Sequence, residues 1–220
     1  MVIEQPSESD PANGWEAEAR HFIATRSPIG ASTVRSWARR LPAGASVLEL
    51  GCGSGFPIAQ ALVDEGLHEH GIDASPSMVA AFRRRFPHAP VACEAAETSE
   101  YFNRTFDGIV AVGLIFLLRP EVQRAVIHRA AAALEPGGRF LFTAPWQVHT
   151  WQDLTTGRTS VSLGADEYRR TLADAGLQVT DEYVDEGGNQ YYDAVRRALV
   201  RRVLVRRAPG GSGEPGRARA

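Results

Sequence analysis

Three glycines at alternating positions follow a short apolar run. The stretch is VLELGCGSGFPIAQAL, residues 47–62, in which Gly51, Gly53 and Gly55 separate the apolar run from an amphipathic segment. Glycines between a strand and a helix let the main chain approach a ligand closely, and the helix N-terminus that follows favours negative charge. Pro57 suits the first helical turn, where its missing N–H costs little. The stretch therefore predicts a strand–turn–helix unit that binds a ligand at the turn.

The next apolar run narrows the choice of ligand. A dinucleotide turn has its third glycine three residues after the second, but Phe56 occupies that position here. The following run, HEHGID, ends in Asp73, 22 residues after Gly51. A carboxylate at the tip of a second strand accepts the hydrogen bonds of a ribose diol. The two features together predict a nucleoside ligand with free 2′ and 3′ hydroxyls.

The rest of the chain alternates short apolar runs with amphipathic segments, as in a parallel sheet covered by helices. Helical patterns precede the sheet between Trp15 and Arg40 and break near SPIG. We expect strands at about 46–50, 68–72, 90–94, 106–112 and 139–144, and helices at about 56–66, 76–86, 120–134 and 165–175. Two more strand-like runs, LQVTDEYV and NQYYDAV, are joined by DEGG, which indicates a hairpin. The prediction is one α/β domain with an antiparallel edge.

Length and charge divide the chain into three parts. The 220 residues suit one domain at 15–196, with a polar, disordered tail at 1–14 and a basic, disordered tail at 197–220. Residues 196–220 carry a net charge of +7. Since the whole chain carries −2, the remaining residues carry a net charge of −9. An acidic body disfavours nucleic acid as a partner, because phosphate contacts dominate that binding. The polar start and the short apolar runs predict a cytoplasmic protein with no membrane partner.

Two features of the composition exclude lysine chemistry and cysteine-based zinc or redox sites. All 24 basic residues are arginine, which removes Schiff-base lysines and the lysine of phosphate-binding loops. The two cysteines, Cys52 and Cys93, form neither a zinc motif nor a paired redox motif. We expect them to be small buried fillers.

Four motifs occur in order at the spacing of a known family. They are VLELGCGSG, GIDASPSM, FDGIVAVG and ALEPGGRFLFTAP. Together they resemble the class I S-adenosylmethionine-dependent methyltransferases of small-molecule type, over about residues 30–195. The resemblance implies a Rossmann-like, doubly wound, mostly parallel seven-stranded sheet with helices on both faces and a C-terminal antiparallel β-hairpin. It also implies S-adenosyl-L-methionine as the cofactor.

The resemblance assigns cofactor contacts position by position. Glu49 and the main chain of the glycine turn would hold the methionine end, Asp73 the ribose, and the residues from Ala74 to Met78 the adenine. CEAAE, residues 93–97, would add a further contact to the adenine. The full set is Glu49, Gly51, Cys52, Gly53, Gly55, Asp73, Ala74, Met78, Glu94, Ala95, Val112 and Gly113.

The acceptor side is less distinct. Three segments can reach the carboxyl ends of the strands, where ligands bind in open α/β sheets: the first helix, the long connection at about 145–164 as a candidate lid, and the DEGGNQYY turn. His149 is the candidate base, because its ordinary pKa lies near neutrality. The substrate-binding candidates are Trp15, His21, Arg26, Trp146, Trp151, Asp153, Asn189 and Tyr191.

The sequence leads to a reaction class with two alternatives. Strand four ends in AVGLIFLL and lacks both the [D/N/S]-P-P-[Y/F] box of amide and base methylation and the aspartates of catechol chemistry. We therefore expect metal-independent, in-line methyl transfer to an O, N or C atom of a small molecule, by a monomer or homodimer. The alternatives are a methyltransferase that holds RNA or protein with its arginine tail, and a non-catalytic regulator that binds S-adenosylmethionine.

Overall fold

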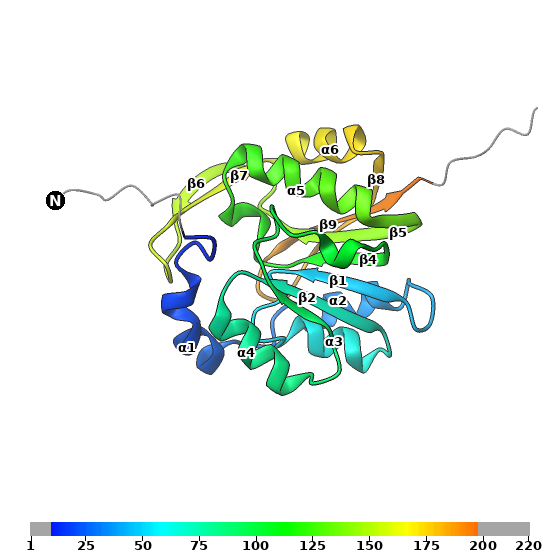
Figure 1. The fold of residues 1–220 in the computed structure, drawn as a ribbon. Coiled ribbons are helices and arrows are strands. Elements are labelled where there is room, and N and C mark those ends of the chain that lie inside the picture. Colours follow the sequence, from blue (N-terminus) through cyan, green and yellow to red (C-terminus); the bar gives the residue numbers. More distant parts are fainter. Residues whose placement is uncertain (1–9, 198–220) are drawn as a thin grey trace, which may run out of the picture.

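The computed structural model describes residues 10–197 (Figure 1). Its helices and strands alternate along most of the chain. In order they are α1 (Trp15–Thr25), α2 (Ala31–Ala38), β1 (Ser46–Leu50), α3 (Ile58–Asp64), β2 (His68–Asp73), α4 (Pro76–Arg85), β3 (Val91–Cys93), β4 (Phe106–Ala111), α5 (Pro120–Ala133), β5 (Leu134–Thr143), β6 (Val148–Gln152), β7 (Thr159–Leu163), α6 (Ala165–Asp174), β8 (Leu177–Val184) and β9 (Gln190–Arg196), with short 3₁₀ turns at Tyr101–Asn103 and Ile115–Leu117.

The main sheet has seven strands in the order β3-β2-β1-β4-β5-β9-β8. β1 is parallel to both β2 and β4, and β9 runs antiparallel to β5 and to β8. The strand order reverses between β1 and β4, where doubly wound sheets bind ligands at the carboxyl ends of their strands. The doubly wound fold, the seven strands and the antiparallel hairpin are confirmed.

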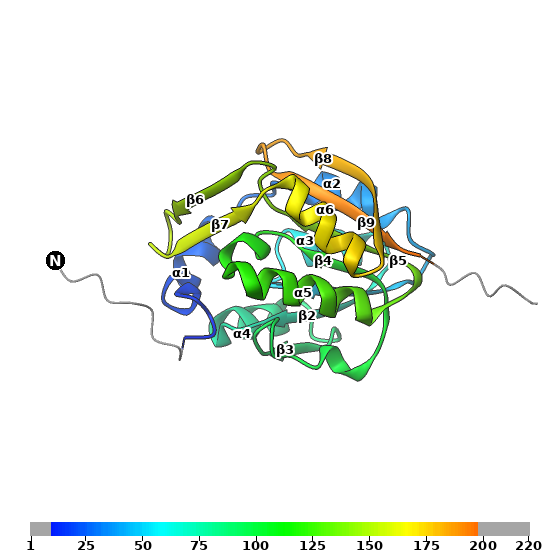
Figure 2. The same ribbon diagram turned by 90° about the horizontal axis from the view of Figure 1, so that it is seen from above.

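Helices cover both faces of this sheet (Figures 1 and 2). On one face, Val126 and Ile127 of α5 and Tyr168 of α6 are buried in the same core as Phe140 and Phe142 of β5. On the other face, residues of α2 and α3 pack against alternate residues of β1, β4 and β5. Both faces of the central strands are apolar because side chains alternate along a strand and each face meets a helix layer.

A buried carboxylate joins α2 to the last strand. Asp193 of β9 is fully buried and accepts hydrogen bonds from Trp37 Nε1 at 3.2 Å and from Arg139 Nη2 at 2.6 Å. Tyr183 Oη also donates to it, at 3.1 Å, and Arg40 Nη1 lies 3.4 Å away. A charge this buried stabilises a fold only when it is paired, so these donors fix α2 and the hairpin in place.

Three features differ from the sequence expectation. α3 starts at Ile58 rather than at 56, because residues 51–57 form the turn. β5 starts at Leu134, so EPGG lies within the strand instead of before it. The connection at 145–164 is not irregular: β6 and β7 form a separate antiparallel hairpin. β6 is mostly exposed, whereas β7 buries Ser160 and Ser162, so neither strand buries an apolar face.

The ends of the chain bear on the predicted domain limits. Residues 10–14, which we expected to lie in the N-terminal tail, form a turn in which Ala12 is buried. Nearly all of the predicted basic tail at 197–220 lies outside the described residues. The domain limits stay a prediction.

Candidate functional site

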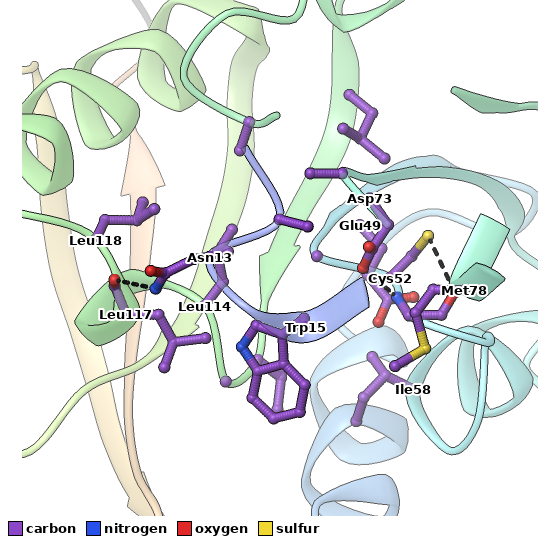
Figure 3. A pocket seen from close by; sticks show the side chains of 18 of the residues that line it. Asn13, Trp15, Glu49, Cys52, Ile58, Asp73, Met78, Leu114, Leu117 and Leu118 are labelled. Carbon is purple, nitrogen blue, oxygen red and sulfur yellow. Dashed lines mark hydrogen bonds between the residues drawn. The ribbon is translucent and has the colours of Figure 1, made fainter. Parts of the chain in front are cut away.

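A cavity of about 280 Å³ lies at the carboxyl ends of the strands, where the strand order reverses. Its lining comes from the turns after β1, β2, β3 and β4, and from the N-terminal segment that includes α1. Figure 3 shows that Trp15 lies between Glu49, Cys52 and Asp73 on one side and Leu114, Leu117 and Leu118 on the other. The cavity thus has a polar wall and an apolar wall.

The β1–α3 turn brings main chain to the polar wall. The N–H groups of Gly51 and Cys52 both donate to Ile72 O, at 2.8 and 3.0 Å, which fixes the turn against the end of β2. Gly51 and Gly53 have φ angles of 71° and 53°, in the left-handed region that favours glycine. Both line the cavity. This turn is the close main-chain approach that the sequence predicts.

Asp73 ends β2 beside this turn. Its Oδ2 accepts a hydrogen bond from Gly53 N and its Oδ1 accepts one from Ser75 N, both at 2.8 Å. An ionised carboxylate has about four acceptor positions, so about two stay free for hydroxyl groups in the cavity. Burial raises the pKa of Asp73, and the two main-chain donors oppose that rise.

Glu49 lies deeper, near the end of β1. Its side chain lines the cavity and is 3% exposed, and its Oε2 has no donor among the described residues. Burial raises the pKa of Glu49 well above its ordinary value, while the Arg26 guanidinium favours the charged form. Arg26 also lines the cavity, and it lies over the Phe22 ring at 5.0 Å. Glu49 is therefore an unsatisfied acceptor that a cationic ligand group would satisfy.

These groups fit S-adenosylmethionine, which carries an ammonium group, a ribose diol and an adenine. Glu49 offers an unpaired acceptor for the ammonium group, and Asp73 keeps free acceptor positions for the diol. Ala74, Met78, Glu94 and Ala95 line the same cavity beyond Asp73. The cavity thus offers an acceptor for the ammonium group and another for the ribose diol.

The apolar wall is built from two segments. Leu114, Phe116, Leu117 and Leu118 follow β4, and residues 11–13 and Trp15 face them across the cavity. Asn13 Nδ2 donates to Leu117 O at 3.0 Å, which joins the two segments. The indole N–H of Trp15 is buried without an acceptor among the residues described.

Most of the predicted site residues line this cavity. They are Glu49, Gly51, Cys52, Gly53, Asp73, Ala74, Met78, Glu94, Ala95, Val112 and Gly113 of the cofactor set, and Trp15, Arg26, Asp153 and Asn189 of the substrate set. Two of them have polar groups engaged elsewhere. Asp153 Oδ1 accepts from the main chain of its own turn, and Asn189 Nδ2 donates to Asp185. Both side chains are therefore held in place by these hydrogen bonds.

The candidate base lies outside the cavity. His149 is exposed on β6, and its ring stacks on Trp151 at 5.6 Å with an interplanar angle of 10°. Trp151 in turn packs against Phe116 at 5.5 Å and does not line the cavity. The alternation of side chains along β6 directs both rings to one face of the hairpin, and Trp151 lies nearer the cavity than His149 does.

Four other candidates lie away from the cavity lining, for separate reasons. His21 is exposed on α1, and Trp146 packs against the core under α5 and α6. Tyr191 is fully buried and donates its hydroxyl to Asp185 Oδ2 at 3.0 Å. A Cβ on Gly55 would meet the Phe86 ring at 2.5 Å, so this glycine permits packing between α3 and α4.

Several lining residues were not in the predicted set. They are Pro11, Ala12, Asn13, Phe22, Ile29, Phe56, Ile58, Ile72, Ala96, Glu97, Leu114, Phe116, Leu117, Leu118 and Thr143. Thr143 could have been found, because it ends β5 at the same edge of the sheet, and its hydroxyl accepts from Gly113 N at 2.7 Å. The turn at 10–14 gave no such indication, because its residues are those of an ordinary polar tail.

Two searches bear on metals and membranes. In residues 10–197, no three or more His, Cys, Asp or Glu side chains are grouped so as to hold a metal ion. None of the helices described has the length and apolar character to cross a membrane. Cys52 and Cys93 are both free thiols; Cys52 is buried as expected, whereas Cys93 is exposed, so the expectation of a buried filler was wrong for Cys93.

Comparison with known proteins agrees with this geometry. Residues 47–138, which include β1 to β4 and the turns that line the polar wall, match the family described as methyltransferase domain. Over these residues the chain is similar to methyltransferases. Its fold is that of the class I methyltransferases, the enzymes that depend on S-adenosyl-L-methionine.

Three proteins illustrate the similarity, one by sequence and two by fold. A carboxy-S-adenosyl-L-methionine synthase of Chromohalobacter salexigens is 36% identical over 107 residues, which are 46% of this chain and 40% of that protein, so the chain spans well under half of that relative's length. The magnesium protoporphyrin IX methyltransferase of Synechocystis PCC 6803, with bound SAM, has a TM-score of 0.68 at 15% identity, covering 88% of this chain and 100% of the other. The 1,6-didemethyltoxoflavin-N1-methyltransferase of Burkholderia thailandensis gives 0.68 at 15%, covering 89% and 93%.

Proposed function

We propose that this methyltransferase domain transfers the methyl group of S-adenosyl-L-methionine to a small, largely apolar acceptor without a metal ion. One observation carries the proposal: a single cavity joins the acceptors on Glu49 and Asp73 to an apolar wall formed by Leu114 to Leu118. The polar wall would hold the cofactor, and the apolar wall beside it would leave a surface for the acceptor.

Bound S-adenosylmethionine would supply an electrophilic methyl group on a good leaving group. The chain's own residues then have three tasks. Glu49 and Asp73 bind and orient the cofactor, the apolar wall excludes water, and that wall also places the acceptor in line with the methyl group. Orientation and exclusion of water together account for a large share of catalysis in such a displacement.

Charge in the cavity defines the acceptor further. Glu49, Asp73, Glu94, Glu97 and Asp153 line it, whereas Arg26 is the sole cation among the described lining residues. Such a surface repels a phosphate or carboxylate and accepts a neutral or basic molecule. We therefore propose an acceptor without an anionic group.

The nucleophile follows from the side chains available. No histidine is among the described residues that line the cavity, and a general base assists chiefly hydroxyl groups and protonated amines. Of the O, N and C acceptors expected from the sequence, nitrogen fits best, because a neutral amine attacks without a strong base and its conjugate acid is attracted by the acidic lining.

Cavity size favours a small molecule over a polymer. A volume of about 280 Å³ is just below the range of typical ligand pockets, roughly 300 to 1,000 Å³. The alternative of an RNA or protein substrate depends on the arginine tail, which lies almost wholly outside the described residues. Deleting residues 198–220 tests it: unchanged turnover of a small acceptor supports our proposal.

The activity test uses labelled cofactor and three matched panels. The purified protein is incubated with methyl-labelled S-adenosylmethionine and with apolar amines, the corresponding alcohols and the corresponding carboxylates. We expect labelled product from amines, little from alcohols and none from carboxylates. Cofactor binding without product in any panel would instead favour the regulator, and labelling of carboxylates alone would contradict the proposed acceptor class.

A further inference from the structure

A second glutamate lies beside Glu49 in the sheet. Glu69 of β2 is 3% exposed, as Glu49 of β1 is. In the parallel pairing, Glu69 is opposite Val47, and Glu49 is opposite Gly71. Residues two apart in a strand share a face, so Glu49 and Glu69 are diagonal neighbours on the same face of the sheet. The structure therefore buries two carboxyl groups side by side.

These two carboxyl groups lack partners when both are ionised. Oε2 of Glu49 and both carboxyl oxygens of Glu69 receive no hydrogen bond from the described residues. The two side chains lie within hydrogen-bonding reach of each other. Two carboxylates are acceptors only, so a bond between them requires that one of them keeps a proton.

We propose that Glu69 keeps its proton at neutral pH and donates it to ionised Glu49, so that it orients the Glu49 carboxylate toward the methionine end of the cofactor. Glu69 is then a positioning residue, which acts through Glu49. The orientation of Glu49 toward the cofactor rests on the proposed function. The proton shared between Glu69 and Glu49 does not depend on it.

The surroundings decide which group is charged. Arg26 faces Glu49 from the segment after α1 and favours its ionised form, although Asp73 at the end of β2 opposes it. Burial and the negative charge of Glu49 both raise the pKa of Glu69. The remaining titratable group that faces the pair, the Cys52 thiol, has its pKa raised by burial and stays neutral. The arrangement therefore places one negative charge on Glu49 and the proton on Glu69.

The proposal predicts the direction of a pH effect. The folded-state pKa of Glu69 is raised, so its contribution to stability is fully present below the ordinary glutamate pKa. That contribution is lost as the pH rises through the folded-state value, because ionisation would place a second charge beside Glu49. Stability should therefore fall progressively as the pH rises above the ordinary glutamate pKa of about 4.5. Cofactor affinity should fall once folded Glu69 ionises, in the alkaline range under this proposal, and a glutamine at position 69 should remove both effects.

The test compares Glu69→Gln, which keeps a donor but cannot ionise, with Glu69→Leu, which cannot ionise either and has no donor. Glu121→Gln, on the exposed surface of α5, is the matched control. Infrared spectra of the ligand-free protein report a protonated carboxyl group, and calorimetry with S-adenosylhomocysteine between pH 6 and 9 reports affinity. We expect a protonated carboxyl band in the wild type at pH 7 that Glu69→Gln removes and the control retains.

Affinity at pH 7 should stay within about twofold in Glu69→Gln and fall by about tenfold in Glu69→Leu, the cost of one hydrogen bond to a charged group. Absence of the band in the wild type, or the same alkaline loss in Glu69→Gln as in the wild type, would overturn the proposal. The wild-type and glutamine data decide this even if the leucine variant does not fold. A wild type that shows the band but binds no S-adenosylhomocysteine would overturn the proposed function while supporting the shared proton.

Discussion

The carboxylate of Glu16 in α1 accepts a hydrogen bond of 2.5 Å from the hydroxyl of Ser75, the N-cap of α4. It also accepts from the hydroxyl of Ser77 at 2.6 Å and from Ser77 N at 3.1 Å. Ala19 is the one buried residue of α1, so this helix is attached largely through polar contacts. Since Trp15 and Phe22 of α1 line the cavity, the Glu16 contact fixes one wall of the site.

Replacing Glu16 with alanine should loosen that wall. We expect Glu16→Ala to cost about 1 kcal/mol of stability, because the lost hydrogen bonds are partly exposed, and to speed release of S-adenosylhomocysteine. Stopped-flow fluorescence of Trp15 measures the release rate. Glu18→Ala, in the same first turn of α1, is the control. An unchanged release rate in Glu16→Ala would show that α1 is held by other contacts.

The same contact predicts a pH dependence. The Ser75 hydroxyl, followed by the hydroxyl and main chain of Ser77, lowers the pKa of Glu16 from about 4.5. A lowered folded-state pKa contributes stability that is present above the ordinary value and is lost as the pH falls through the folded value. The difference in stability between wild type and Glu16→Ala, measured by thermal unfolding, should therefore shrink below about pH 4.5. A difference that grows in acid would contradict the assignment.

Asp193 should be the most sensitive position outside the cavity. Asp193→Ala leaves the Arg139 guanidinium, which is mostly buried, without its nearest partner. Removing one member of a buried charge pair costs about 3–5 kcal/mol. Urea unfolding measures the loss, and Asp181→Ala, which removes an exposed partner of Arg40, is the control with an expected cost below about 1 kcal/mol. Equal costs in the two variants would refute the special role of Asp193.

His149, the base expected from the sequence, can be tested by substitution. His149→Ala should leave kcat and cofactor affinity within about twofold, because the ring is exposed outside the cavity. Steady-state kinetics across the neutral pH range check this, and a large fall in kcat with a lost pH inflection would restore His149 as the base.

Gly55→Ala should destabilise the fold although Gly55 does not line the cavity. Its φ of 81° is unfavourable for alanine, and the new Cβ would meet the Phe86 ring. Overpacking of this kind costs about 1–3 kcal/mol, which thermal unfolding would show. A fully stable variant with weakened cofactor binding would return Gly55 to the cofactor set.

The sequence is informative wherever local rules decide the structure. Strand β1, the glycine turn and Asp73 were predicted because the conformation of a turn after a strand depends on its own few residues. The motif resemblance added the role that we propose for Glu49. Glu69 was not predicted, since a glutamate in HEHGID gives no indication of its burial until the register of β1 and β2 is known.

The acceptor side of the cavity could not be predicted from local sequence patterns. In the β6–β7 hairpin, β6 is mostly exposed and the buried residues of β7 are Ser160 and Ser162, so neither strand shows the buried apolar alternation by which strands are found in a sequence. Asn13 donates a hydrogen bond to Leu117, although the two are 104 residues apart in the sequence. Only the folded structure brings them together. His149 was a reasonable candidate by pKa, but proximity to the cavity depends on how the hairpin is oriented.

Binding of S-adenosylhomocysteine to the wild type and to Asp73→Ala, measured by calorimetry, tests the central claim most directly. The account predicts one site per chain in the wild type and a loss of about 1–3 kcal/mol in the variant, because a hydrogen-bonded charged acceptor is removed. Asp107→Ala, which removes the acceptor for Ser46 N at the opposite end of β1, should bind as the wild type does. No binding to the wild type, or equal affinity in Asp73→Ala, would contradict the account.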